Sequence, residues 1–515
     1  MKPKMLLRYL SFIALFAVAS ASLIQAFIPS ARPYLSNVSL QKVFKFVKPK
    51  PKPHIPTVEE LRAAAVKEAF SQTFEGYFSR CRGQDEFLPV TESCSNTRNA
   101  WGASAVDALS TALVMGIEPI VTEIIQFIPT VDFTHSEMEV NLFETTIRYL
   151  AGLIAGYDLL KGPFANMTTD AAAVESLLSQ SKVLADSLKY SFDTPTGIPN
   201  NILNFTNQGT DGADTNGLAT TGSLVLEWQR LSDITGDSTY GDLAQRAESY
   251  LINAQPPENI PFPGLLGTRL SIENGLFRDA NGGWGGSTDS YYEYLIKMYI
   301  YDSERYVQYR DQWIVAADST IKYLASHPIT RPDLTFLSLY RNTTLVKASS
   351  HLTCFDGGSF LLGGQALARQ DYIDFGLELV KGCHETYAST ATHIGPEGFS
   401  WDEKQVPIEQ QDFFKEHGFY INNPFYDLRP EVIESYYYAY RVTGDKMYQE
   451  WAWDAFVAIN ATCRVGKGFS SIFNVTVEDG GGPANGQESF IFAEVLKYSY
   501  LIQAPVSNGF LQCQW

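Results

Sequence analysis

A recurring pair of helical segments joined by a glycine turn restricts the fold of this chain more than any other feature. Gly236 and Gly444 each follow one helical pattern and precede another, over residues 230–247 and 441–455. A weaker copy, without the glycine, spans residues 301–324. Glycine commonly ends helices because it adopts the left-handed conformation without strain. Recurrent helical hairpins of this kind favour stacked or closed helical pairs over independent domains.

Long helices are predicted where apolar residues recur at intervals of three and four. The clearest such segments are residues 142–159, 177–192, 218–235 and 290–301. β-like pieces occur only in short connections, and no change in composition interrupts residues 58–502. We therefore predict an all-α fold with short β connections, an α/α toroid that forms one domain over residues 58–502.

The N-terminus predicts entry into the secretory pathway. Lys2, Lys4 and Arg8 precede a charge-free, mostly apolar run over residues 9–31, which is typical of a signal peptide or a signal anchor. The small residues at 19–21 favour cleavage, whereas a run long enough to span a bilayer, roughly 20 residues, favours retention. We prefer a retained anchor over residues 1–31, because a Lys/Pro-rich, stem-like segment follows at residues 32–57.

Composition narrows the class of ligand and the compartment. The net charge of -18 argues against nucleic acid, whose phosphates require clustered lysine and arginine. Six cysteines allow 15 disulfide connectivities, and the lack of a C-x-x-C pair makes a zinc site improbable. Six N-x-S/T sequons, the acceptor pattern of secreted glycoproteins, begin at Asn37, Asn166, Asn204, Asn342, Asn460 and Asn474.

A cluster of charged residues surrounds Pro430. Proline is tolerated in the first turn of a helix, so we place Pro430 at the first helical position. Glu431 and Glu434 then lie on one helix face, three residues apart. Carboxylates near a helix N-terminus are favoured by the helix dipole alone, so helix capping explains one of them without any function. Capping does not explain the adjacent Arg429.

Other carboxylates lie at predicted helix starts beside aromatic residues. Glu144 and Arg148, spaced i, i+4 among apolar neighbours, are either an ordinary helix ion pair or a buried pair in a cleft. Asp289 follows a Gly/Trp loop and precedes three tyrosines, so it is either a helix N-cap or part of a sugar subsite. His351 and Glu488 are weaker candidates, and an exposed loop is the simpler interpretation of Asp85-Glu86.

Separated carboxylates with aromatic neighbours suit a glycosidase. An inverting glycosidase needs a carboxylic acid and a carboxylate that activates water, roughly 6.5–9.5 Å apart. No nucleophile elbow, P-loop or dinucleotide fingerprint competes with this interpretation. The residues by themselves therefore predict a glycan-acting toroid of the secretory pathway.

Six motifs occur in the order in which a known family carries them. The chain resembles the class I α-1,2-mannosidases, glycoside hydrolase family 47, and their fungal branch in particular, from about residue 60 to about residue 502. The resemblance implies an (αα)7 barrel that removes terminal α-1,2-linked mannose from high-mannose N-glycans with inversion, over a bound calcium ion. The motifs are residues 98–109, 143–148, 289–294, 351–355, 429–435 and 488–490.

The resemblance also implies roles for individual residues. Glu144 matches the general acid, acting directly or through water, and Asp289 a second acidic residue with a claim to the same role. Glu431 matches the general base. The remaining matches are Arg148, His351 and Arg429 as subsite residues, Glu434 and Glu488 as carboxylates that hold calcium-bound waters or the sugar, and Cys354 with Cys383 as a disulfide.

The last residues depart from the family pattern. The family ends in Asn-Thr-Glu-Ala-His, whose threonine binds calcium directly, but residues 503–515 contain no threonine. We therefore expect no direct metal ligand in this atypical tail, and weakened calcium binding and activity. The alternatives are a mannose-binding, lectin-like quality-control protein and an inactive pseudoenzyme of the same fold. In either case we expect a monomer, in the Golgi or endoplasmic reticulum membrane with a luminal domain, or secreted if the N-terminus is cleaved.

Overall fold

The computed structural model describes residues 55–505 of the 515-residue chain. By its contacts the chain divides into Met1–Ile55 and Pro56–Trp515. All the described helices and strands lie in the second unit. The predicted leader or anchor (1–31), most of the predicted stem (32–57) and most of the predicted tail (503–515) lie outside the described residues. Over residues 55–505, no helix combines the length and the apolar composition that a bilayer crossing requires.

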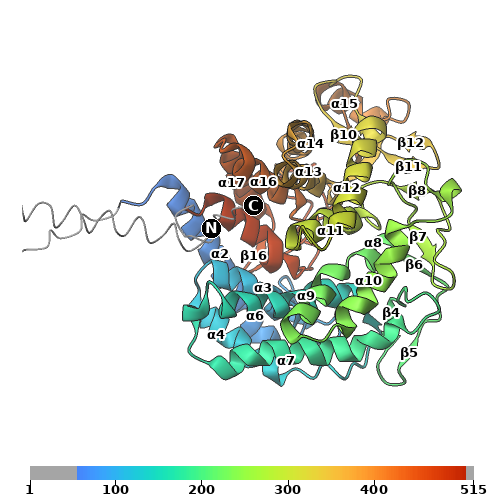
Figure 1. Cartoon of the computed structure of the whole chain (residues 1–515). Helices are drawn as coiled ribbons and strands as arrows, with labels where there is room; N and C mark the ends of the chain where they lie inside the picture. Colours follow the sequence, from blue (N-terminus) through green and yellow to red (C-terminus); the bar gives the residue numbers. More distant parts are fainter. Residues whose placement is uncertain (1–54, 506–515) are drawn as a thin grey trace, which may run out of the picture. The chain divides into compact units, whose positions relative to one another are not determined.

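Helical pairs form a closed ring, in which one helix of each pair lines the centre and its partner covers it from outside (Figure 1). The inner helices pack side by side in chain order, and the last closes the ring against the first. Within the described residues the inner helices are α3 (Ala103–Val114), α5 to α6 (Leu142–Thr145 and Ala151–Lys161), α8 to α9 (Leu218–Gly222 and Val225–Thr235), α11 (Asp289–Tyr301), α13 (Asp356–Leu367), α16 (Glu431–Thr443) and η10 to α18 (Ile491–Val495 and Leu496–Gln503).

Each inner helix packs against one outer helix. Within residues 55–505 the first helix, α2, pairs with the last, α18, so that the two ends of the described segment meet in one hairpin-like pair. The outer helices are α4 (Glu118–Phe127), α7 (Ala171–Leu188), α10 (Thr239–Ile252), α12 (Val307–Ser319), α14 (Gln370–Ala388), α17 (Met447–Thr462) and α2 (Val58–Cys81). The predicted toroid of helical pairs is therefore confirmed.

Local sequence signals explain where these helices begin and end. Thr57 and Glu60 form a capping box at the start of α2, with reciprocal side-chain hydrogen bonds of 3.2 and 2.8 Å to the backbone. Gly236 and Gly444 end α9 and α16 in the left-handed conformation, as predicted. One predicted helix differs: the 218–235 segment breaks at Ser223, which separates α8 from α9.

Short helical turns complete the ring and its connections. The inner helix from α5 to α6 contains a π-helical turn, η3, and α18 begins in another, η10. The turn η3 spans Thr146–Leu150. The other short elements are η2 (Ile128–Thr130), η4 (Ala165–Met167), η5 (Lys189–Phe192), η6 (Pro257–Asn259), η7 (Thr320–Leu324), η8 (Leu352–Phe355), η9 (Ile408–Gln410) and the helix α15 (Gln411–His417).

Strands occur only in connections between helices, as predicted. They pair antiparallel into sheets of two or three strands, and two of these sheets lead directly into site residues. These two sheets are β3-β4-β5 (Val140–Asn141, Ile202–Asn204, Gly209–Thr210) and β13-β14-β15 (Ala348–Ser350, Gly398–Ser400, Tyr420–Asn423). The others pair β1 with β2 (Glu86–Leu88, Ser93–Ser95), β6 with β7 (Thr215–Gly217, Arg269–Ser271), β9 with β10 (Ala325–Ser326, Phe336–Leu337), β16 with β17 (Arg464–Val465, Gly468–Phe469), and β8 with β11 and β12 (Asn281–Gly282, Leu339–Arg341, Thr344–Val346).

Two disulfides lie in the described residues. Cys354 pairs with Cys383, the pairing that the resemblance implied, and this bond joins η8 to α14. Cys81 pairs with Cys94 and ties the end of α2 to β2. Cys463 is buried and free, and Cys513 lies outside the described residues. Loop closure of this kind typically stabilises a protein by about 2–4 kcal/mol per bond.

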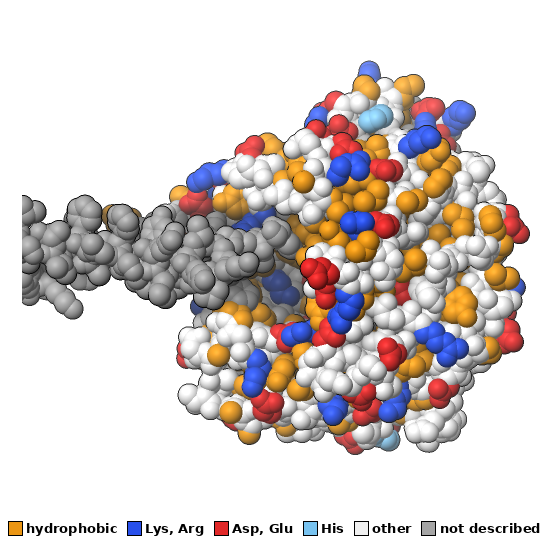
Figure 2. Space-filling model, viewed as in Figure 1, with side chains coloured by type: hydrophobic (Ala, Val, Ile, Leu, Met, Phe, Trp, Pro, Cys, Tyr) orange, Lys and Arg blue, Asp and Glu red, His pale blue; other side chains and the backbone are white. Residues whose placement is uncertain are grey.

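The surface carries charges of both signs. Figure 2 shows one face, on which acidic and basic side chains are interspersed among apolar ones. Many of these side chains form ion pairs with a neighbour on the surface, such as Arg305 with Asp233 at 2.6 Å and Arg369 with Asp371 at 2.5 Å. Exposed pairs of this kind contribute only about 0–1 kcal/mol each, so the stability of the ring rests on its packed interior.

Close packing between the inner and outer rings makes Gly363 sensitive to substitution. A Cβ at Gly363 of α13 would lie 2.1 Å from Cη2 of Trp313, whose indole is fully buried in α12. Gly363→Ala should therefore lower the free energy of unfolding by about 1–3 kcal/mol, measured by urea denaturation. Trp313→Phe removes the clashing atom, so Gly363→Ala should cost less in that background. An equal cost in both backgrounds would contradict this packing.

Candidate active site

A cavity of about 500 Å³ lies at the centre of the ring. Its wall is supplied by five of the inner helical segments and by the loops that precede α11 and α16. Carboxylates dominate its polar lining: Glu144, Asp289, Glu293, Glu431, Glu434 and Glu494. Charges this close to one another in a buried site must be paired or protonated, so their partners decide what the cavity can do.

Glu144 lies at the start of an inner helix and forms two ion pairs. The Asn141 side chain caps α5 by accepting the N–H of Glu144 at 2.9 Å. Glu144 Oε2 accepts hydrogen bonds from Nε of Arg148 at 2.8 Å and from Nε of Arg98 at 3.2 Å. Burial alone would raise the pKa of Glu144, but the two guanidinium groups lower it overall. Glu144 is therefore ionised at neutral pH.

Arg148 is held by more than its helix neighbour. It lies in the π-helical turn η3, and such turns are frequent at functional sites because they re-aim a side chain. Its Nη1 donates to Ser489 Oγ at 3.3 Å, and its guanidinium lies 5.5 Å from the centroid of the Phe490 ring. The pair with Glu144 is largely buried, which favours the cleft interpretation over an ordinary surface ion pair.

The loop that carries Arg98 is organised by the buried carboxylate of Asp85. Its two oxygens accept hydrogen bonds from five backbone N–H groups between residues 98 and 103 and from the hydroxyl of Tyr149. The expectation of an exposed Asp85-Glu86 pair is wrong, because Asp85 is fully buried and Glu86 is 6% exposed. The donors are backbone groups of a distant loop, which no side-chain pattern reveals.

Asp289 is the first residue of α11, directly after the glycine-rich loop. Thr288 occupies the N-cap position, so the alternative in which Asp289 is only an N-cap is wrong. The Asp289 carboxylate accepts the N–H of Ser290 at 2.9 Å. Burial raises the pKa of Asp289 to about 7, and the charges of Glu293 and Glu431 add to this shift. A carboxylic acid that keeps its proton near neutral pH can act as a proton donor.

Glu431 is the first residue of α16, and its carboxylate forms a hydrogen bond with His351. Pro430, predicted at the first helical position, lies one residue earlier, at the N-cap. His351 Nδ1 lies 2.8 Å from Glu431 Oε2. Burial would raise the pKa of Glu431, but the hydrogen bond from His351 and the charge of Arg429 lower it overall. Glu431 is therefore an ionised carboxylate that can accept a proton.

Arg429 reaches the cavity through a strained turn. Leu428 is buried and has a φ of 56°, a left-handed conformation that is unusual for a branched residue and is often found at functional sites. Arg429 Nε donates to both oxygens of Glu397, at 2.5 and 2.9 Å. Glu397 directly precedes β14, and its carbonyl accepts the N–H of His351 at 3.1 Å. The turn therefore places a guanidinium beside Glu431.

Glu434, Glu494 and Glu293 form a second group of carboxylates in the cavity. Burial, together with repulsion from Glu293, raises the pKa of Glu434 well above its ordinary value, and Tyr498 donates its hydroxyl proton to Glu434 Oε1 at 3.0 Å. Burial and the charge of Glu431 likewise raise the pKa of Glu494 to about 7. Glu293 is instead paired with Lys297 on the same helix. This group of carboxylates is thus only partly compensated by the described side chains.

Most of the predicted site residues meet at this cavity. Two do not line it: His351 contacts Glu431, and Glu488 lies 3.9 Å from Arg98, which binds Glu144. Burial and the charge of Asp427 raise the pKa of Glu488. The predicted residues that line the cavity are Glu144, Arg148, Asp289, Arg429, Glu431 and Glu434.

Sequence reasoning missed several residues of the site. Glu293 follows Asp289 by four residues on one helix face, so that spacing was available as a signal. Arg98 opens the first motif and Glu494 follows Glu488 by six residues, but nothing in the sequence linked either to Glu144 or Glu431. Glu397 lay in no motif. Over residues 55–505, no group of three or more His, Cys, Asp and Glu side chains is placed to hold a metal ion directly.

Comparison with known proteins identifies the family. The family model described as "Glycosyl hydrolase family 47" matches residues 69–512. The chain belongs to this family. It is 59% identical over 447 residues to a mannosyl-oligosaccharide alpha-1,2-mannosidase of Coccidioides posadasii, covering 87% of this chain and 86% of that protein. It is 57% identical over 446 residues to mannosyl-oligosaccharide alpha-1,2-mannosidase 1B of Aspergillus oryzae, covering 87% and 88%.

A solved structure shows the same fold. The alpha-1,2-mannosidase from Trichoderma reesei superposes with a TM-score of 0.85 at 48% sequence identity, covering 86% of this chain and 93% of that one. The predicted membership of glycosyl hydrolase family 47 and its all-α barrel are therefore confirmed. The cavity described above is the largely acidic centre of a family 47 barrel.

The raised pKa of Asp289 has a consequence for stability. Because the pKa is about 7 in the folded state against 3.8 for the free side chain, the folded protein binds a proton that the unfolded chain releases between these pH values. The free energy of unfolding therefore falls as pH rises through this window. Asp289→Asn should raise it by about 2–4 kcal/mol above about pH 8 and leave it unchanged below about pH 4.

Urea denaturation at both pH values measures this effect. Asp311→Asn, at a side chain that is 60% exposed, is a matched control and should change stability little at either pH. Equal stabilisation by Asp289→Asn at both pH values would contradict the raised pKa.

Proposed function

We propose that this chain is an inverting α-1,2-mannosidase that removes terminal mannose from high-mannose N-glycans. Membership of glycosyl hydrolase family 47 and the printed activity of its relatives support this substrate class. The observation that carries the proposal is the difference in protonation among carboxylates that line one cavity from different helices. Asp289 keeps a proton near neutral pH, whereas Glu431 and Glu144 stay ionised.

Asp289 is the proton donor in the proposed mechanism. Inverting hydrolysis requires a carboxylic acid that protonates the leaving oxygen and a carboxylate on the other side of the sugar ring. Glu144 matched the acid by family resemblance, but two arginines hold it ionised, so it is a poor direct donor. Glu144 instead stabilises positive charge that develops on the sugar ring, or orients a water molecule.

Glu431 is the base that removes a proton from the attacking water. The hydrogen bond from His351 keeps one oxygen of the carboxylate in place and leaves the other free to accept. Arg429 and Arg148 both line the cavity, where their guanidinium groups bind sugar hydroxyls. Arg429 is held by Glu397 and Arg148 by Glu144. Inversion requires room for a water molecule between the carboxyl groups of Asp289 and Glu431.

The carboxylates of Glu434, Glu293 and Glu494 suit a cation that is held through water molecules. Calcium prefers oxygen ligands and tolerates a flexible shell, and the repulsion between Glu434 and Glu293 is the kind that a cation relieves. No described group of acidic side chains is placed to hold a metal directly, so we assign Glu434, which lines the cavity, and Glu488, which lies outside its lining near Arg98, to bound waters. When present, calcium would bind vicinal hydroxyls of the sugar.

A location in the secretory pathway fits the covalent features of the described residues. Disulfides such as Cys354–Cys383 persist in oxidising compartments. The sequon residues Asn166 and Asn342 are exposed, whereas Asn460 lies within α17 with its side-chain oxygen buried. We therefore place the barrel in the lumen or outside the cell. The high-mannose glycan remains the one proposed partner.

Mannose release tests the proposed reaction. Incubated with a Man9 glycan, the chain should release mannose whose first-formed anomer is β, observed by proton NMR. Activity should fall as pH rises through about 7, because Asp289 then loses its proton, and fall again at acidic pH as Glu431 is protonated. Glu431→Gln should lower kcat by at least about 100-fold with little change in KM.

The alternatives predict different outcomes. A lectin-like protein would bind the glycan without releasing mannose, and a first-formed α anomer would exclude inversion. The comparisons do not favour the lectin-like alternative, because the relatives reported above are named as mannosidases.

Metal removal tests the proposed cation. EDTA should lower mannose release, and added Ca²⁺ should restore it, because a cation offsets the repulsion near Glu434. Isothermal titration with Ca²⁺ should show weaker binding to this chain than to one whose residues 503–515 are replaced by a tail ending in Asn-Thr-Glu. Unchanged activity in EDTA would contradict the assignment of Glu434 and Glu488 to a metal.

A further inference from the structure

His351 is held at both of its ring nitrogens. The ring is almost fully buried, at 2% exposure. Nδ1 lies 2.8 Å from Glu431 Oε2, and Nε2 lies 2.8 Å from the hydroxyl oxygen of Tyr387. The residue therefore links the carboxylate of α16 to a tyrosine of the outer helix α14.

Tyr387 lies near the C-terminal end of α14 and is 3% exposed. Burial raises the pKa of its hydroxyl well above the ordinary value, so the hydroxyl keeps its proton. The hydroxyl oxygen of the neighbouring Tyr426 lies 3.1 Å from the carbonyl oxygen of Arg429. Tyr426 also forms a hydrogen bond with the Tyr387 hydroxyl, and this bond lowers the pKa of Tyr387, as expected where Tyr426 is the donor. The proton of Tyr387 then points at His351 Nε2, 2.8 Å away.

The proton positions along this chain follow from the chemistry of its members. An ionised carboxylate such as Glu431 only accepts hydrogen bonds, so the Nδ1 of His351 carries a hydrogen. A neutral imidazole then has an acceptor at Nε2, which the hydroxyl of Tyr387 satisfies. Each group donates to the next, from Tyr387 through His351 to Glu431.

We propose that Tyr387 is a positioning residue for the base: by donating to Nε2 of His351, it holds the imidazole in the Nδ1–H tautomer that donates to Glu431. Without this hydroxyl, a hydrogen on Nε2 becomes an accessible alternative, and in that tautomer His351 cannot donate to the carboxylate. Tyr387 does not line the catalytic cavity, so it acts only through His351. The kinetic part of this inference rests on the proposed function.

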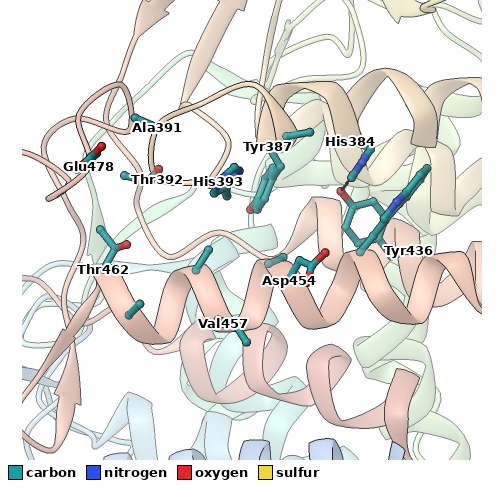
Figure 3. A pocket seen from close by; sticks show the side chains of 15 residues that line it. His384, Tyr387, Ala391, Thr392, His393, Tyr436, Asp454, Val457, Thr462 and Glu478 are labelled. Atoms are coloured by element: carbon teal, nitrogen blue, oxygen red, sulfur yellow. Dashed lines mark hydrogen bonds between the residues drawn. The ribbon is translucent and has the colours of Figure 1, made fainter. Parts of the chain in front are cut away.

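The same tyrosine also has a structural role that the test must separate. Tyr387 lines a second pocket of about 630 Å³ on the outer side of the ring, between α14 and α17 (Figure 3). Tyr436 lines this pocket as well, and its hydroxyl lies 2.8 Å from Nδ1 of His384. Loss of the Tyr436 hydroxyl therefore also deprives a buried histidine of its partner, with no hydrogen-bonded path to Glu431 among those described.

The test compares Tyr387→Phe with the matched control Tyr436→Phe in the full chain. Selective ¹⁵N labelling of histidine reports the tautomer of each ring by NMR, and His351 is assigned by the signal that His351→Gln removes. The wild type and Tyr436→Phe should show His351 as Nδ1–H, whereas Tyr387→Phe should show a substantial Nε2–H population. In Tyr387→Phe, kcat should fall roughly 10- to 100-fold, the range found for partners that orient metal-ligating histidines, with KM nearly unchanged.

Three outcomes overturn the proposal. The first is an unchanged His351 tautomer in Tyr387→Phe. The second is a tautomer change with no loss of kcat. The third is an equal loss of kcat in both variants, which would mark Tyr387 as structural only. If the wild type released no mannose, the proposed function would fail, while the NMR measurement would still decide whether Tyr387 sets the tautomer.

Discussion

The ion pairs and hydrogen bonds of the central carboxylates govern the chemistry that this ring supports. A closed ring of helices buries whatever its inner faces carry, and a buried carboxylate must either find a partner or keep its proton. Glu144 has two arginines and Glu431 has His351, so both are ionised. Asp289 has only backbone and hydroxyl donors and two acidic neighbours, so its pKa rises to about 7. Similar side chains thereby acquire opposite roles.

Backbone geometry places these partners where they are needed. The π-helical turn at Thr146–Leu150 includes Arg148, and the left-handed Leu428 precedes Arg429. Both features are locally unfavourable and persist because the surrounding ring constrains them. The buried Asp85, which accepts five backbone N–H groups, similarly fixes the loop that carries Arg98. Local strain and a buried charge thus position Arg148, Arg429 and Arg98 at the acidic cavity.

Part of this arrangement could be predicted from the sequence. The glycine that ends each helix and the capping box at Thr57 depend on neighbouring residues, so local patterns reveal them. The helix around Leu218 was predicted as continuous but breaks at Ser223, between two segments that both pack against α11. Apolar periodicity records only positions along one helix and does not report such a break. Asp85 was expected in an exposed loop, because its backbone donors lie 13 to 18 residues away.

By itself, the sequence determined the helical pairs, their ends and the motifs that carry Glu144, Asp289 and Glu431, since each depends on residues a few positions apart. Only the tertiary structure decided the partners of these groups. Arg98 reaches Glu144 from 46 residues away, and His351 reaches Glu431 from 80. Ring closure brings such segments together. In a buried site each contact then shifts the pKa of a carboxylate enough to decide whether it keeps its proton.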